Sequence, residues 1–310
     1  MRTHFHDYPI FFVTNRCLEE RFFFIPKPGI IKIIGSWLAK ALKKYGDGIE
    51  LYGFVFLSNH LHLLLKDTKG QLAKFMWYFQ LNVGKALNRH LGRRGYFFSR
   101  EYDAAPVLTE EDFEDRYAYI LTNAVKPGLV AKAKDSPFFS SLKAALEGKK
   151  LQFTWLDRTK KHNKTRRGQQ VDDGQFEERN DIVLAIPPMW KGLSAKERRA
   201  RIEGLIKANE VRYGKERRAE GREVLGVRRI LAQSPFARPK NPARSPRVKV
   251  FCRDKELEKQ YLEAVRSTVA MYREAYDGFM KSARKRRKSL VEWPPGCYPP
   301  SSMIPIGAFE

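Results

Sequence analysis

Two histidines have a spacing that suits metal chemistry. His60 and His62 lie in the stretch LYGFVFLSNHLHLLLK, residues 51–66. Residues two apart in an extended strand point to the same face, so the two imidazoles are expected side by side. Two neutral imidazoles on one rigid strand are suitable ligands for a divalent metal. One solvent-facing and one core histidine is the alternative interpretation. The position of the pair, where an apolar strand leaves a turn, favours a site.

A tyrosine and an asparagine form a second candidate set, on a helix predicted to begin after Thr109. Thr109 is a suitable N-cap, and acidic residues follow it in the first turn. The apolar stripe of this helix consists of Phe113, Tyr117, Ile120 and Leu121. Tyr119 lies about 120° from Phe113, off the stripe, and Asn123 shares its face four residues later. An ordinary half-buried tyrosine is the alternative interpretation.

Basic residues suited to DNA contact follow the histidine strand. The candidates are Lys85, Arg89, Arg93, Arg94 and Arg100. The first two lie on a helix predicted at about residues 71–91, and the others alternate with aromatic residues at 93–100. This alternation suits phosphate contact combined with base stacking on single strands. A solvated helix face and a basic loop anchored by its aromatic side chains are the alternatives.

The composition favours a polyanionic partner. The chain has 310 residues, 43% hydrophobic and 13% aromatic, enough for one large or two ordinary domains. Its net charge of +24 exceeds what solubility needs, so nucleic acid is the first candidate partner. Residues 1–150 hold 23 Lys and Arg against 15 Asp and Glu, and residues 151–310 hold 36 against 20. The second half is therefore expected to bind flanking DNA or a hairpin stem, unless it covers apolar surface of the first.

The cysteines and the chain start favour a cytoplasmic protein. Cys17, Cys252 and Cys297 form neither a disulfide framework nor a CxxC metal site. No secretory signal is evident at the start of the sequence, and its apolar runs are too short to span a membrane. We therefore expect a reduced, cytoplasmic protein without membrane contact.

The order of predicted elements favours an α+β fold. The predicted order begins with strand 8–14, which a hairpin at 20–25 could extend. It continues with helix 29–45, strands 49–57 and 60–66, helix 71–91, strand 102–108 and the Thr109 helix. This order predicts a ferredoxin-like split βαβ antiparallel sheet with helices on one face. Its central strands would carry the histidine pair, and the Thr109 helix would bring Tyr119 near them.

The rest of the chain predicts a mainly helical, basic extension. We expect a first domain at residues 1–147, a polar linker at 148–185 and a C-terminal region at 186–310. The last contains helices at 193–218, 222–231 and 254–288, a proline-rich stretch at 234–247 and a proline-rich tail. The first two helices could enter a DNA groove, and a solvated basic hairpin is the alternative.

Four motifs, in this order, resemble those of the single-tyrosine HUH transposases. They are ELYGFVFLSNHLHLLL, GYFFSREYDAAPVL, YAYILTNAVKPGLV and SPFFSSL, within roughly residues 8–145. The resemblance is strongest to the REP-associated tyrosine transposase branch. It implies an HUH nuclease core in which His60, His62 and Asn123 bind a divalent metal and Tyr119 attacks DNA. Two departures, Ala124 in place of proline and LSN in place of MPN, remove no reactive group.

The resemblance implies cleavage and rejoining of single-stranded or hairpin DNA through a 5′-phosphotyrosine. Mg²⁺ or Mn²⁺ is the expected metal, and two histidines also admit zinc. No nucleotide cofactor is expected, because the phosphotyrosine ester conserves the energy of the broken bond. The alternatives are a domesticated, non-catalytic DNA-binding protein and, less favoured, an RNA-binding protein. Either a monomer or a homodimer fits the sequence.

Overall fold

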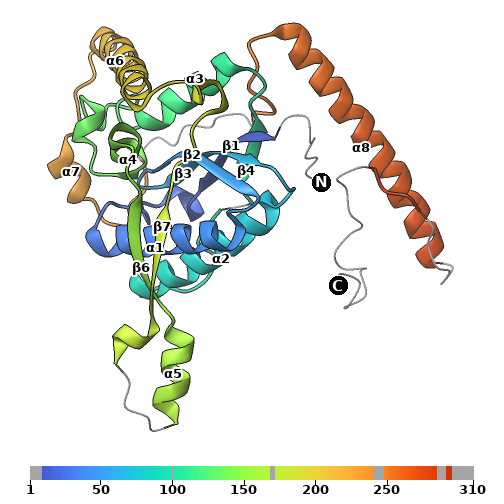
Figure 1. Cartoon of the computed structure of the whole chain (residues 1–310), viewed down its shortest axis with the longest axis horizontal. Helices are drawn as coiled ribbons and strands as arrows, with labels where there is room; N and C mark the ends of the chain where they lie inside the picture. Colours follow the sequence, from blue (N-terminus) through green and yellow to red (C-terminus); the bar gives the residue numbers. More distant parts are fainter. Residues whose placement is uncertain (1–8, 100, 168–171, 240–247, 285–290, 295–310) are drawn as a thin grey trace.

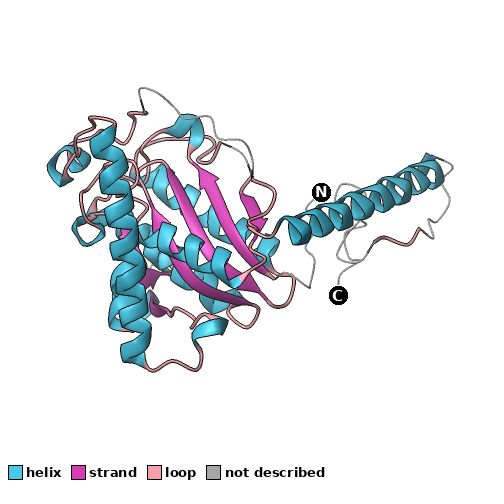
Figure 2. Ribbon diagram, turned by 90° about the horizontal axis from the view of Figure 1, so that it is seen from above, coloured by secondary structure: helices cyan, strands magenta, loops and turns pink. Residues whose placement is uncertain are grey.

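The computed structural model describes residues 9–99, 101–167, 172–239, 248–284 and 291–294 (Figures 1 and 2). Its centre is a five-stranded sheet with the order β4-β1-β3-β2-β5, in which all neighbours are antiparallel. The strands are β1 (Ile10–Arg16), β2 (Ile49–Phe56), β3 (His60–Asp67), β4 (Asp103–Pro106) and β5 (Phe139–Ser140). The predicted mixed fold with an antiparallel sheet is confirmed, and β3 lies between β1 and β2 as a split βαβ order requires.

Helices cover both faces of this sheet, whereas the sequence predicted them on one. Helices α1 (Pro28–Tyr45) and α2 (Leu72–His90) pack on one face, and α3 (Glu110–Leu121) packs on the other (Figure 1). Alternate residues of β1 therefore enter different cores: Phe11 and Val13 face α1 and α2, and Phe12 faces α3. Burial on both faces explains why β2 and β3 are nearly continuous apolar runs.

The residues predicted as a polar linker contain a second, two-stranded sheet. Strands β6 (Leu151–Leu156) and β7 (Glu177–Ile182) pair antiparallel, with α5 (Arg158–Arg166) beyond them. The pair packs against α1, where the ring of Trp155 lies 5.6 Å from that of Trp37. Strand β7 consists mostly of charged and polar residues, and both strands pack against α1, a helix distant in sequence, so neither strand was predicted.

Most of the C-terminal elements lie beside the central sheet. Helix α6 (Ala195–Ala219) runs next to α3, α4 (Leu142–Glu147) lies nearby, and α8 (Lys255–Arg284) projects from the body (Figure 2). Helix α7 (Val227–Leu231) is shorter than predicted. Short 3-10 helices occupy Leu18–Glu20, Ala133–Asp135, Asp173–Phe176 and Pro188–Trp190. The first of these precedes residues 20–25, where the predicted hairpin does not form.

Some predicted features lie outside the described residues, namely much of the proline-rich stretch and most of the tail. Within the described residues, no helix combines the length and apolar character needed to cross a bilayer.

Candidate functional site

The two histidines open β3 on the sheet face that α3 covers. Their ring centres are 4.9 Å apart and the rings are nearly perpendicular. Pairing with β1 sets Thr14 opposite His62 and Arg16 opposite His60. Side chains directly opposite each other in neighbouring strands share a face. Antiparallel pairing therefore adds a hydroxyl and a guanidinium to the histidine pair.

Each imidazole is oriented through its Nδ1 atom. The Thr14 Oγ1 atom lies 2.8 Å from Nδ1 of His62, and the Asn59 Oδ1 atom lies 2.7 Å from Nδ1 of His60. An amide oxygen accepts only, so His60 carries its proton on Nδ1 and has its lone pair on Nε2. Metal-binding histidines are commonly held by such a bond at the other ring nitrogen. His60 thus has an Nε2 atom suited to a ligand role, and His62 has one when its Nδ1 donates to the Thr14 hydroxyl.

Burial keeps both imidazoles neutral near pH 7. It lowers the pKa of His60 to about 4, with a further contribution from the Arg16 charge. It also lowers the pKa of His62 well below the usual value, and His60, Arg16 and Arg116 act in the same direction. Only the neutral imidazole has a lone pair for a metal. The electrostatics of this face therefore favour the metal-binding form.

Helix α3 brings Tyr119 against the histidines. The Thr109 side chain caps α3 by accepting a bond from the Asp112 backbone, as predicted. The Tyr119 ring centre lies 5.5 Å from that of His62 and 6.0 Å from that of Phe12. Burial raises the pKa of Tyr119, while a hydrogen bond from Asn123 and the Arg116 charge oppose that rise. The hydroxyl is therefore protonated at neutral pH until something withdraws its proton.

Asn123 lies in the turn that follows α3, one residue beyond the C-cap Thr122. Its side chain is 3% exposed, and its Oδ1 atom has no hydrogen-bond partner among the described residues. A buried amide oxygen without a partner costs free energy, so such an atom calls for a ligand. Two imidazole nitrogens and one amide oxygen suit Mn²⁺, Mg²⁺ or Zn²⁺. The residues present therefore fit a divalent metal.

This donor set depends on the asparagine. In the described part of the chain, no group of three or more His, Cys, Asp or Glu side chains is placed to hold a metal ion. The candidate donors are therefore two histidines and an amide, which the spacing of His60 and His62 and of Tyr119 and Asn123 indicated in the sequence.

Two cations beside Tyr119 were not predicted. The Arg116 Cζ atom and the Lys126 Nζ atom each lie 5.3 Å from the Tyr119 ring centre. Arg116 precedes Tyr119 by three residues, so helical spacing could have shown that it shares the tyrosine's side of α3. Lys126 follows the turn that holds Asn123, and only the folded turn brings it back to the tyrosine.

The basic residues predicted to bind DNA lie in different places. Lys85 and Arg89 are exposed on α2, on the sheet face opposite the histidines. Arg93 donates to the Asn88 side chain and the Tyr96 carbonyl, and it lies 4.2 Å from the centre of the Phe23 ring. These contacts give Arg93 a structural function.

The end of this basic segment does approach the histidines. Phe98 forms a bridge with Cys17, and the Ser99 amide donates to the Arg16 carbonyl at the end of β1. Arg94 is exposed just before this segment, and Arg100 lies outside the described residues. The segment therefore borders the end of the sheet where His60 lies.

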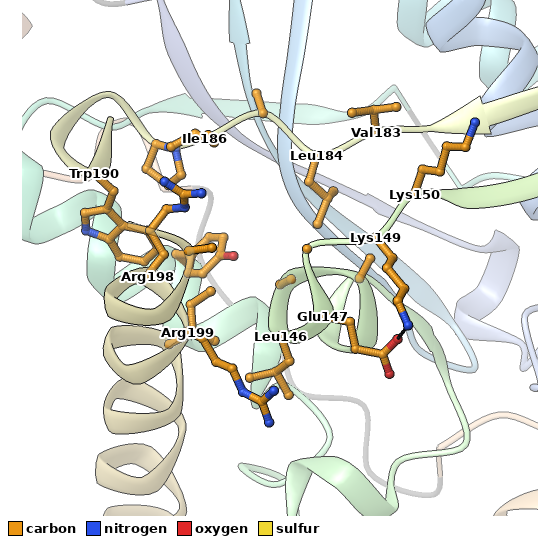
Figure 3. Close-up of a pocket in the computed structure, with 18 of the residues that line it drawn as sticks. Leu146, Glu147, Lys149, Lys150, Val183, Leu184, Ile186, Trp190, Arg198 and Arg199 are labelled. Carbon is orange, nitrogen blue, oxygen red and sulfur yellow. Dashed lines mark ion pairs between the residues drawn. The ribbon is translucent and has the colours of Figure 1, made fainter. Parts of the chain in front are cut away.

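A hollow lies on another side of α3 (Figure 3). It measures about 570 Å³ and is bounded by α4, residues 183–187, Trp190 and the start of α6. Tyr117 lines it and packs 5.3 Å from Trp190, whereas Tyr119, about 200° further round the helix, faces the histidines.

The cations around the hollow are largely neutralised. Lys149 pairs with Glu147, Lys150 pairs with Asp181, and Arg199 pairs with Glu203. The lining carries no histidine or cysteine and no unpaired nucleophile beside a base. The histidine face, with its neutral imidazoles and nearby tyrosine, is therefore the candidate site.

Comparisons with known proteins gave one similarity. No protein-family model and no curated protein matches the chain. Among solved structures, it is similar to that of a REP-associated tyrosine transposase bound to a REP hairpin. That match has 18% identity and a TM-score of 0.38, and it covers 47% of this chain and 84% of that one. A similarity of this strength does not assign a function.

Proposed function

We propose that the chain is a metal-dependent enzyme that cleaves and rejoins single-stranded DNA through Tyr119. The observation that carries the proposal is the packing of Tyr119, 5.5 Å ring to ring, against His62 of a neutral histidine pair. The net charge of +24 and the cations beside the tyrosine suit a phosphodiester substrate. These features support a DNA-processing function of the transposase type.

In the proposed reaction, the Tyr119 oxygen attacks a backbone phosphorus. The new O–P bond forms as the bond from phosphorus to the 3′ oxygen breaks. The tyrosine proton is lost, and the 3′ oxygen leaves with a proton as a free hydroxyl. The product is a 5′-phosphotyrosine, from which a DNA 3′-hydroxyl later displaces the tyrosine. The ester conserves the bond energy, so no nucleotide is consumed.

The chain's own residues would hold and orient the reactants. His60, His62 and Asn123 would bind the divalent metal, Mg²⁺ or Mn²⁺ in the first instance. When bound, the metal supplies a Lewis acid for the phosphate oxygens. Asn123 also hydrogen-bonds to Tyr119, so one side chain would link the nucleophile to the metal site.

A non-catalytic DNA-binding protein is the second candidate, because the positive net charge of the chain would be enough for DNA binding. A binder does not need an unpartnered buried amide oxygen or a tyrosine against two neutral histidines. The two candidates differ in whether a covalent product forms.

The decisive experiment uses a 3′-labelled DNA strand with a single-stranded segment next to a hairpin. The full chain is incubated with this DNA and Mn²⁺, and the mixture is run on a denaturing gel. We expect a labelled band at the position of a protein–DNA adduct. Tyr119→Phe should abolish it, because the ring remains and only the nucleophilic oxygen is lost.

Tyr117→Phe is the matched control, because Tyr117 lies two residues away and faces the hollow. This variant should retain the adduct. Absence of an adduct from the wild type over a range of hairpins and metals would favour the non-catalytic binder. An adduct that persists in Tyr119→Phe would place the nucleophile elsewhere.

A further inference from the structure

Arg116 and Lys126 present positive charge next to Tyr119, the proposed nucleophile. Each lies 5.3 Å from the Tyr119 ring centre. Neither forms a hydrogen bond or an ion pair with any residue that the structure describes. Their contacts are with aromatic rings, which leave the N–H groups available.

The two acids that precede Arg116 directly in the sequence are paired with other cations. Glu114 accepts two hydrogen bonds from Arg201 of α6, and Asp115 pairs with Arg253 of the segment before α8. The C-terminal half thus supplies the partners for these carboxylates of α3. Arg116 itself has no ion-pair partner among the described residues.

The Phe251 ring also contacts the Arg116 guanidinium. Its ring centre lies 4.6 Å from the Arg116 Cζ atom and 5.4 Å from the Phe12 ring centre. The Phe251 amide donates to the Pro106 carbonyl, and its carbonyl accepts from the Leu108 amide. A segment far along the chain therefore adds to the edge of the sheet at β4 and places one ring in the site.

We propose that Arg116 and Lys126 form a binding subsite for backbone phosphodiesters beside Tyr119, and that Phe251 positions Arg116 in it. The assignment of the scissile phosphate to this subsite rests on the proposed function. A guanidinium offers paired N–H donors that match phosphate oxygens, and the Lys126 ammonium adds a second positive charge beside the Tyr119 ring. Phe251 acts through Arg116 and does not itself touch the phosphate.

The test measures the affinity of the full chain for a single-stranded oligothymidine, without added metal, at a series of salt concentrations. Each lost phosphate contact should reduce the slope of log K against log salt by about 0.7 for single strands. Arg116→Gln and Lys126→Gln should each show this reduction. Lys132→Gln, which removes an exposed lysine in the same region, is the matched control and should leave the slope unchanged.

The function of Phe251 is tested by combining variants. Phe251→Ala should weaken binding, and the double variant with Arg116→Gln should bind no worse than Arg116→Gln alone. Phe251→Tyr should restore binding because it keeps the ring. Additive losses would show that Phe251 acts separately from Arg116, and the positioning proposal would be wrong.

The outcomes separate this proposal from the nuclease proposal. Reduced slopes in a protein that forms no covalent adduct would support the subsite and reject catalysis by Tyr119. An adduct with unchanged slopes in both charge variants would support the nuclease and overturn the subsite. Circular dichroism of each variant checks that the fold is retained.

Discussion

Replacing Thr14 by valine tests whether the histidine pair is built to bind metal. The substitution keeps the branched shape of the side chain and removes the hydroxyl that lies 2.8 Å from His62 Nδ1. His62 is 6% exposed, so water does not easily replace the lost partner. The imidazole keeps its place in the sheet but loses the hydrogen bond at Nδ1 that orients the ring.

Two magnitudes follow from this change. A buried ring nitrogen left without its hydrogen-bond partner costs about 1–3 kcal/mol, so the free energy of unfolding should fall by that amount. Loss of a partner that orients a metal-binding histidine typically weakens metal affinity about 10–100-fold. The first effect should appear without metal, and the second should appear as a weaker dissociation constant.

The assay combines urea unfolding with calorimetric titration of Mn²⁺ and Zn²⁺ into the folded protein. Thr14→Ser is the matched control, because it retains the hydroxyl and loses only a methyl group. It should bind metal nearly as the wild type does. Metal affinity in Thr14→Val equal to that of the wild type, despite lower stability, would refute the reasoning that this hydroxyl prepares His62 as a ligand.

Other predictions concern the packing around the site. Burial would raise the pKa of Glu114, but hydrogen bonds, led by the one from Arg201, lower it overall. The ionised Glu114 therefore stabilises the folded state. This contribution is complete above the unfolded pKa of about 4.3 and is lost as pH falls through the folded pKa. Glu114→Gln should therefore flatten the decline in unfolding free energy below that pH. Gly35→Ala should destabilise the chain by about 1–3 kcal/mol, because the new Cβ would lie 2.1 Å from the Phe153 ring. Gly204→Ala, which meets nothing within 4 Å on α6, should instead stabilise it by about 0.5–1 kcal/mol, as thermal unfolding would show.

Truncation near Leu146 would remove residues that pack against the first domain. Phe153 packs on α1, Trp190 packs on Tyr117, and Phe251 extends the edge of the sheet. Such a chain would expose apolar surface on both faces of the first domain. Residues after 147 therefore contribute to the packing around α3.

Local sequence determined the elements that carry the candidate residues. The apolar runs predicted β2 and β3 nearly to their ends, and Thr109 with its acids predicted the start of α3. Strand period sets His60 and His62 on one face, and helical period sets Tyr119 off the apolar stripe. These features depend on residues within a few positions of one another, so a sequence can show them.

Tertiary structure alone decided what surrounds those residues. The pairing of Thr14 with His62 depends on strand register, which brings together residues 48 positions apart. The face on which α3 packs, and the approach of Phe251 to Arg116, depend on which apolar surfaces bury each other best. Burial also fixes the neutral state of the histidines, because desolvation depends on atoms from the whole fold. The sequence thus indicated the candidate groups, while long-range packing set their orientation, protonation and neighbouring charges.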